Sequence, residues 1–253
     1  MKLGRLPKKF NPKTLKLSKY LESPLVTAPP PPPEKVWREY KVPSDQWGMF
    51  GNDTIGDCTC ACIAHMLMLV TAHTGTMIVP SESDVITAYS AVSGYDPSTG
   101  ANDNGAAITD VLNYWQTNGI SGHKILGWAE IDYTNIDQIK QAIWLFGGVD
   151  LGVNIAQAAM EQFSAGQSWE VVPDDGGIEG GHSIPNFGYG SDGTNCITWA
   201  QRQAMSWVWF AKYVEEAYAV ITQDWIVQAT QETPSGFDLA TLQTDLAYIQ
   251  QQA

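Results

Sequence analysis

The sequence predicts an α+β fold in which a helical half precedes a half rich in antiparallel strands. Helical signals dominate residues 58–146, and strand and turn signals dominate from residue 182 onward. A chain of 253 residues is long enough to bury a sizeable core. Because strands and helices do not alternate along the chain, a parallel doubly wound sheet is not expected.

The helical half begins with two segments that carry start signals. Residues 58–73 are mostly apolar, and Asp57 stands at the N-cap position before them. The second segment starts at Ser81, with Asp84 three residues further on, and it stops at Gly94. Both segments are therefore predicted to be helices, and residues 96–105 form the loop that follows.

Two more helices are predicted before the strands begin. Residues 106–117 have apolar side chains at helical spacing and stop at the Asn118–Gly119 pair. Residues 135–148 form the next predicted helix, and the apolar segment 149–155 after it is predicted to be a strand.

The strand-rich half consists of four short segments separated by turn residues. The predicted strands are 183–190, 196–201, 205–214 and 216–222. The sequence "GYGSDG" at 188–193 matches a dinucleotide-binding glycine pattern, but a strand follows it where that motif needs a helix. We therefore interpret it as a turn.

Charge is distributed very unevenly along the chain. Residues 1–41 hold ten Lys and Arg against three Glu, which gives +7. The remaining chain has four basic and twenty-four acidic residues, which gives −20 within a total of −13. Nucleic acids and anionic membrane surfaces would repel so acidic a body.

The composition also divides the chain into three parts. Residues 1–36 are predicted to be a basic, proline-rich, extended arm, in which Pro29–Pro33 forms a stiff spacer. Such an arm is either a disordered tail or a segment ordered on an acidic surface, whether its own or a neighbour's. Residues 37–230 form the globular domain, and residues 231–253 form an extension expected to be helical at its end.

The sequence also bears on the compartment. No apolar leader follows the N-terminal Met-Lys-Leu-Gly-Arg, and no apolar run is long enough to span a membrane. Three of the four cysteines crowd into five residues, which makes a poor disulfide framework. We therefore expect a protein without a signal peptide, located in the cytoplasm or in a virus particle.

Among the cysteines, Cys58 is the candidate nucleophile. It lies in the first turn of its predicted helix, where unpaired amide groups and the helix dipole favour a thiolate. Cys60 and Cys62 lie deeper in apolar sequence and are expected to be small packing residues. The candidate base is His182, which follows Gly180–Gly181 at the start of a strand-like segment.

A metal site competes with this interpretation. Cys58, Cys62 and His65 share one helical face, and Cys196 would be the fourth ligand. Structural zinc sites usually use short loop-borne spacings such as C-x-x-C, which do not occur here. We therefore expect no metal and no cofactor.

Several segments together resemble the papain-like cysteine peptidases, over nearly all of residues 44–222. "DCTCACIAHML" is similar to the start of the family's central helix, and "GGHSIPNFGYG" to its histidine strand. "DNGAAITDVLNYWQTNGI" and "IKQAIWLFGGVDLGVNI" resemble its second helix and the step to the second lobe. "ITWAQ", "SWVWF" and "EAYAVI" resemble its closing strands. The resemblance implies a body of two lobes, one helical and one strand-rich.

The resemblance also implies roles for four residues. Cys58 would be the nucleophile and His182 its base. Asn52 stands six residues before Cys58, where the family has a glutamine that stabilises the oxyanion. The family's third member is an Asn; here "CITWAQ" offers Thr198 as the nearest polar substitute. The nearby tryptophans Trp199, Trp207 and Trp209 either shield the pair from water or form a plain aromatic core.

These residues lead to two functional hypotheses. The first is a thiol-dependent amide hydrolase that acts on a peptide or protein. The second is a structural or interaction protein with the same fold, such as a capsid-associated component of a virus particle anchored to an assembly partner by its arm.

Overall fold

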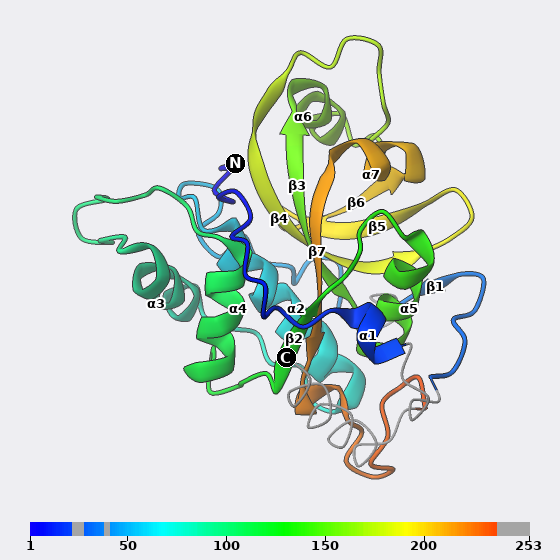
Figure 1. Cartoon of the computed structure of the whole chain (residues 1–253). Coiled ribbons are helices and arrows are strands. Elements are labelled where there is room, and N and C mark those ends of the chain that lie inside the picture. Colours follow the sequence, from blue (N-terminus) through cyan, green and yellow to red (C-terminus); the bar gives the residue numbers. More distant parts are fainter. Residues whose placement is uncertain (22–27, 38–40, 237–253) are drawn as a thin grey trace.

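The computed structural model describes residues 1–21, 28–37 and 41–236. Helices and one antiparallel sheet make up two lobes, which confirms the predicted α+β class (Figure 1). The first lobe contains α2 (Cys58–Thr74), α3 (Glu82–Ser93) and α4 (Ile108–Thr117). The second is built on the sheet, with α5 (Ile136–Phe146), α6 (Gln157–Ser164) and α7 (Trp207–Tyr213) packed around it.

Seven strands form the sheet within the described part of the chain, and every pairing is antiparallel. In spatial order they are β2 (Gly127–Glu130), β7 (Val214–Ile221), β3 (Val149–Ala156), β4 (Ile178–Tyr189), β5 (Gly193–Thr198) and β6 (Gln201–Ser206). The short β1 (Lys35–Val36) also pairs with β4. Strand β4 is therefore bonded to three neighbours, and it contacts α2 in the other lobe.

Helix α2 lies in the middle of the molecule. Every residue from Cys58 to Thr71 is buried, because this stretch has almost no charged or strongly polar side chain to present to water. The side chain of Asp57, which was predicted to cap the helix, makes no capping hydrogen bond. That part of the prediction is wrong: Asp57 stands at the N-cap position, but its backbone is not extended (φ −95°, ψ 17°).

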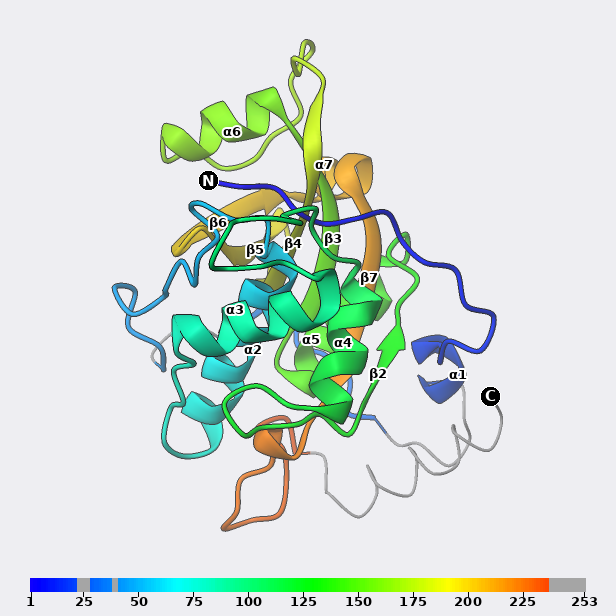
Figure 2. The same cartoon turned by 90° about the vertical axis from the view of Figure 1, so that its left-hand side faces the viewer.

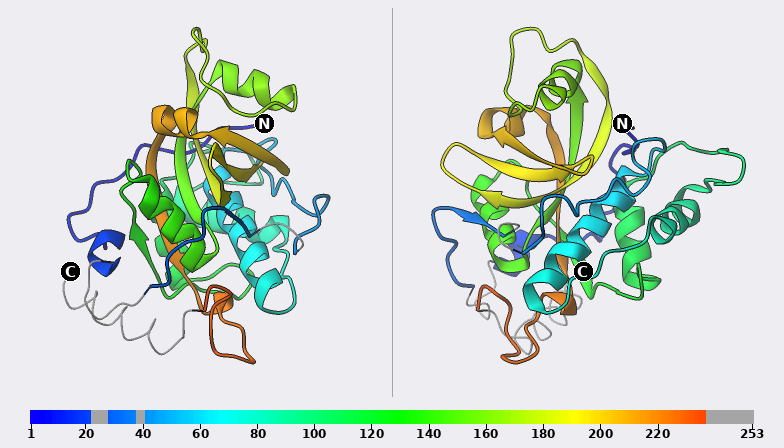
Figure 3. Two further views of the ribbon diagram at one scale, coloured as in Figure 1. Left: turned by 90° about the vertical axis from the view of Figure 1, so that its right-hand side faces the viewer. Right: turned by 180° about the vertical axis from the view of Figure 1, so that it is seen from behind.

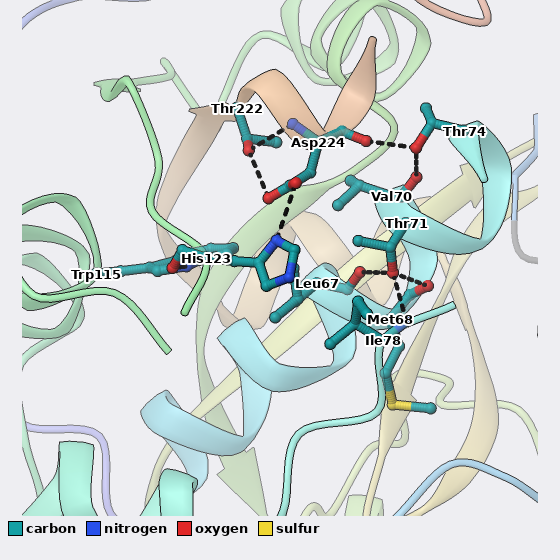
Figure 4. Close-up of polar contacts among 10 residues, drawn as sticks. All are labelled: Leu67, Met68, Val70, Thr71, Thr74, Ile78, Trp115, His123, Thr222 and Asp224. Atoms are coloured by element: carbon teal, nitrogen blue, oxygen red, sulfur yellow. Dashed lines mark hydrogen bonds and ion pairs between the residues drawn. The ribbon is translucent and has the colours of Figure 1, made fainter. Parts of the chain in front are cut away.

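The far end of α2 is fixed by a polar cluster near the end of β7 (Figure 4). Thr74 Oγ1 donates to the carbonyl of Asp224 at 2.7 Å, and the Asp224 carboxylate lies 2.9 Å from His123 Nδ1. Thr71 Oγ1 accepts the amide of Ile78 at 2.9 Å. These contacts hold the C-terminal turn of α2 in place, and Cys58 lies at the opposite end of the helix.

The other early helices follow the predicted signals. Ser81 accepts the amide of Asp84 at the start of α3, and Gly94 ends it in the left-handed conformation (φ 76°). At α5 the side chain of Asn135 caps the first turn, and Gly147 ends the helix (φ 83°). These two helices thus begin where a side chain satisfies a free amide and end where glycine reverses the chain, whereas α4 has no side-chain cap and Asn118 follows its last residue.

The prediction of a strand at 205–214 is wrong. Strand β6 ends at Ser206 and residues 207–213 form α7. Ser206 Oγ accepts the amide of Trp209, and Trp209, Phe210 and Tyr213 form its buried face while Val208 is exposed. The aromatic residues suggested a strand, but their burial pattern is helical. The predicted strand at 196–201 is also displaced, because Trp199 and Ala200 form the turn between β5 and β6.

The N-terminal arm lies against the chain's own body (Figures 2 and 3). It contains the short α1 (Leu17–Leu21), whose Leu17 is only 1% exposed. Lys8 and Lys16 pair with Glu130, and Lys9 pairs with Asp110. The proline stretch is also bonded to the body, because Gln141 Nε2 and Tyr189 Oη donate to the carbonyls of Pro29 and Pro32. Most of the predicted C-terminal extension, residues 237–253, lies outside the described residues.

Ser206→Ala tests the assignment of α7. Loss of the cap should cost about 0.5–2 kcal/mol, and each kcal/mol lowers Tm by about 2–4 °C in a chain of this size. Thermal unfolding followed by circular dichroism measures the shift. Ser164→Ala in α6 is the matched control, because Ser164 Oγ bonds only within its own helix. An equal loss in both variants would contradict the capping role.

Candidate active site

Cys58 is the first residue of α2 and faces strand β4. It is 1% exposed, and the backbone groups of Ser183 and Gly4 lie near its sulfur and lower the pKa of the thiol, which burial raises. Ser183 directly follows His182 on β4, so the first turn of α2 packs beside the candidate base. Gly4 belongs to the N-terminal arm, more than fifty residues away in sequence.

His182 is held by strand β5. It is 2% exposed, and its Nε2 lies 2.8 Å from Oγ1 of Thr198. Trp199 stacks on the imidazole, with ring centroids 4.5 Å apart and planes 19° from parallel. The other ring nitrogen, Nδ1, has no hydrogen-bond partner among the described residues. The ring is thus fixed by Thr198 and Trp199, which leaves Nδ1 available to a reacting group.

The position of Trp199 requires an unusual backbone. Trp199 and Ala200 both have positive φ (44° and 61°) in the two-residue turn between β5 and β6. Such turns normally use Asn or Gly, because larger side chains are strained there. The strain is retained where it places the indole on His182, and strained residues are typical of functional sites. Trp209, in contrast, stacks on Trp169 in the core.

Asn52 lies in the loop before α2 and is 3% exposed. Its side-chain amide donates to the carbonyls of Ile55 at 3.2 Å and Lys2 at 3.3 Å. Nε1 of Trp199 also points at the Lys2 carbonyl, at 3.4 Å. Two side chains of the candidate site therefore already bond one carbonyl group of the arm.

Residues 1–6, which we call the N-terminal strap, cross the site between the two lobes. The amide of Lys2 bonds the carbonyl of Asn52, and the amide of Arg5 bonds the carbonyl of Gly181. The contact is very close at Gly4, where an added Cβ would lie 1.9 Å from the carbonyl oxygen of Gly56. Only glycine fits there.

Gly105 and Ala106 hold the strap on its other side. The amide of Ala106 bonds the carbonyl of Gly4, and the amide of Leu6 bonds the carbonyl of Ala106. A Cβ on Gly105 would lie 2.1 Å from the oxygen of Gly4. The sequence does not predict this contact, since Gly4, Gly56, Gly105 and Arg5 are dispersed along the chain and carry no periodic signal.

Burial controls the ionisation of the pair. It raises the pKa of the Cys58 thiol to about 12, and the nearby carboxyl groups of Asp57 and Asp150 disfavour the thiolate further. Burial lowers the pKa of His182 to about 3, and the charge of Arg5 acts in the same direction. With the strap in place, thiol and imidazole are both neutral at neutral pH.

The residues of the zinc alternative do not converge on one point. His65 Nε2 lies 2.8 Å from the carbonyl of Gly48, and its ring packs against Trp47 and Phe50. In the part of the chain that the structure describes, no three His, Cys, Asp or Glu residues are grouped to hold a metal ion. The same part contains no helix long and apolar enough to cross a membrane.

Several solved cysteine protease structures are similar to this chain along most of its length. Xylellain, a cysteine protease from Xylella fastidiosa, superposes with a TM-score of 0.61 at 13% identity, over 87% of this chain and 96% of that chain. The Amb a 11 cysteine protease of ragweed pollen, in its proform, gives 0.56 at 16% identity, over 80% and 69%. The cysteine protease CMS1MS2 of Carica candamarcensis, in complex with E-64, gives 0.53 at 15% identity, over 76% and 99%. This chain adopts the papain-like fold.

Comparisons of the sequence alone do not detect the papain-like fold. No family model matches the chain, and no curated protein matches it either. Thr198 bonds His182, Cys58 lies near the backbone of Ser183, the residue after His182, and Asn52 bonds Lys2 of the strap. The catalytic roles of Cys58, His182, Asn52 and Thr198 stay a prediction.

Asp57, directly before Cys58, is a buried acid whose effect can be measured. Burial raises its pKa to about 8, and neither carboxyl oxygen has a hydrogen-bond partner among the described residues. Asn52 lies near, but its amide hydrogens go to Lys2 and Ile55. A folded-state pKa above the unfolded value contributes stability that is fully present below about pH 4 and is lost as pH rises through about 8.

Asp57→Asn should therefore stabilise the protein at pH 8.5 by at least about 1 kcal/mol, or about 2–4 °C in Tm. The gain should shrink progressively toward pH 4, where the acid is protonated in both states. Thermal unfolding of both proteins across this range measures it. Asp53→Asn, at an exposed carboxyl in the same loop, is the control. A gain that does not depend on pH would contradict the buried charge.

Proposed function

We propose that this protein is a thiol-dependent amide hydrolase acting on peptides, with Cys58 as nucleophile and His182 as base. The observation that carries the proposal is the orientation of His182. Thr198 binds Nε2 and Trp199 fixes the ring plane, so the unpaired Nδ1 is the atom left to exchange a proton with a thiol. Cys58 is the first residue of α2, lies near the backbone of Ser183 and supplies that thiol.

The chemistry follows in two halves. Nδ1 of His182 takes the thiol proton as the sulfur attacks the substrate carbonyl carbon, and a tetrahedral oxyanion forms. The side-chain amide of Asn52 and the backbone amide of Cys58 donate to that oxyanion. The imidazolium then protonates the departing amine, and the C–N bond breaks to leave a thioester on Cys58. Water, deprotonated by His182, hydrolyses the thioester and restores the thiol.

The contacts of the strap support the role given to Asn52. Its amide donates to a peptide carbonyl of the strap, at Lys2, so the group is already directed at a carbonyl that crosses the site. The strap nevertheless differs in one respect from a bound substrate. The backbone of Gly4 lies near the sulfur of Cys58, where the carbonyl of a substrate would have to approach. Hydrolysis therefore requires the strap to move.

The alternative of an assembly component depends on an arm that can reach another chain. Leu17 and Arg5 are instead buried on the chain's own body, and Lys8, Lys9 and Lys16 pair with its own carboxylates. Among the described residues of the arm, the exposed large apolar side chains are those of Met1 (48%), Leu6 (38%) and Phe10 (84%). Most of the basic and apolar contacts of the arm are thus made with its own body, and the hydrolase is the better supported function.

Labelling with a thiol-directed epoxide tests the proposal. Mass spectrometry of the native protein should locate the adduct on Cys58, and Cys58→Ser should abolish it. Cys60→Ser is the control and should retain full labelling, because Cys60 is buried within α2. Arg5→Ala should label faster than the unaltered chain, since Arg5 anchors the strap. Equal labelling of Cys58 and Cys60 would contradict a specific nucleophile.

The role of His182 is tested separately, by hydrolysis of a peptide mixture in the Arg5→Ala background. His182→Ala should lower the rate by about 10²–10⁴-fold, as expected for loss of a general base. Thr198→Val keeps the shape of the side chain but removes the hydroxyl, and it should lower the rate less. Unchanged rates in both variants would rule out the proposed pair.

A further inference from the structure

The most deeply bound side chain of the strap is that of Arg5. The Arg5 side chain is 2% exposed, although Arg5 is the fifth residue of a basic arm. Nη1 donates to Oε1 of Glu216 at 2.6 Å, and Nη2 donates to Oδ1 of Asn154 at 2.8 Å and Oε2 of Glu215 at 2.9 Å. We call Asn154, Glu215 and Glu216 the Arg5 pocket.

All three residues of the pocket belong to the body, on strands β3 and β7. Glu216, on β7, is 1% exposed, and its second carboxyl oxygen accepts the hydroxyl of Tyr218 at 2.7 Å. Gly152 lies opposite on β3, where an added Cβ would come within 2.3 Å of Cγ of Glu216. Glycine at 152 therefore leaves the space that the Glu216 side chain occupies. The carboxylate is held in place by β3 and β7 alone.

The chemistry of the pocket selects a guanidinium group. A buried carboxylate is costly unless a cation is paired with it, so Glu216 requires a positive partner. Three acceptors on two strands match the planar, forked donors of guanidinium better than the single point charge of an ammonium. Nε of Arg5 has no partner among the described residues, so recognition depends on the two terminal nitrogens.

The residue that fills the pocket is the neighbour, along the strap, of the residue that lies near the sulfur of Cys58. Gly4, whose backbone lies near the sulfur of Cys58, directly precedes Arg5, and the amide of Arg5 donates to the carbonyl of Gly181, the residue before His182. A peptide whose side chain fills the pocket therefore has its backbone beside both members of the candidate pair. Glu215, with 51% of its side chain exposed, forms the outer rim.

We infer that the Arg5 pocket is a binding site for the arginine side chain of a peptide substrate, occupied in the resting chain by the protein's own Arg5. As a statement about substrates, this rests on the proposed hydrolase; as a statement about a guanidinium site, it does not. The strap then blocks the thiol by presenting the side chain that the site recognises, and an arginine-bearing peptide competes with it directly.

Binding is tested on the full chain carrying Arg5→Ala, which empties the pocket. The probes are methylguanidinium and methylammonium chloride at equal millimolar concentrations, and the readout is Tm. Methylguanidinium should raise Tm saturably and methylammonium should not, and neither should raise Tm of the unaltered chain. Equal responses to the two cations, or a response in the unaltered chain, would overturn the proposal.

Two double variants locate the site. Adding Glu216→Gln to Arg5→Ala should weaken methylguanidinium binding at least tenfold, whereas Glu215→Gln, at the exposed rim, should weaken it much less. Equal weakening by the two substitutions, or none by Glu216→Gln, would count against the pocket. Where Arg5→Ala fails to fold, Arg5→Lys keeps a cation beside Glu216. There, methylguanidinium should still stabilise the protein more than methylammonium, and equal stabilisation would overturn the inference.

Selectivity is tested by hydrolysis. In the Arg5→Ala chain, peptides bearing arginine should be cleaved at least tenfold faster than matched peptides bearing leucine or lysine at that position, and Glu216→Gln should remove the preference. Cleavage without any preference would refute the substrate class while leaving the hydrolase intact. Absence of cleavage by every variant would count against the hydrolase, and the probe titration would still decide the pocket.

Discussion

The burial of helix α2 against strand β4 is the contact on which the rest of the structure depends. A helix with no polar face cannot lie at the surface, so the sheet and the other helices must surround it. This forces the first residue of α2 against the strand that carries His182 and Ser183. The hydrogen bond from Thr74 to the carbonyl of Asp224 holds the opposite end of α2. The candidate site is thus a consequence of how the core packs.

The same burial keeps the Cys58 thiol and the His182 imidazole neutral while the strap is bound. Cys58 and His182 are both desolvated, and desolvation favours the neutral form of an acid and of a base alike. The strap contributes to that desolvation, because Gly4 lies near the sulfur of Cys58 and Arg5 bonds the residue before His182. The uneven charge of the chain also finds a local explanation. Basic residues of the arm meet acidic residues of the body, and the chain neutralises part of its own −20.

Features repeated along the sequence were predictable, and features made by single contacts were not. The early helices follow from apolar spacing and from caps such as Ser81 and Gly94, and the α+β class follows from their order. The short α6 and α7 were missed, since in α7 aromatic residues favour strands until Ser206 caps the turn. Cys58 and His182 stood out by position. Nothing local distinguishes Arg5 from the other basic residues of the arm, because its partners Asn154 and Glu216 lie on strands far away in sequence.

The buried ion pair between Arg5 and Glu216 links the closed state of the site to its selectivity. Breaking such a pair from one side is strongly unfavourable, because the remaining carboxylate stays buried without a counter-charge. Water alone is therefore a poor replacement for Arg5, and an apolar side chain is a worse one. A ligand that brings its own guanidinium replaces the lost contacts and leaves Glu216 paired throughout. The interaction that holds the strap in place, between a guanidinium group and Glu216, is then the same one that a suitable substrate forms. The guanidinium of the substrate replaces that of Arg5 as the strap leaves, so the strap is displaced most readily by the ligand that the pocket binds best.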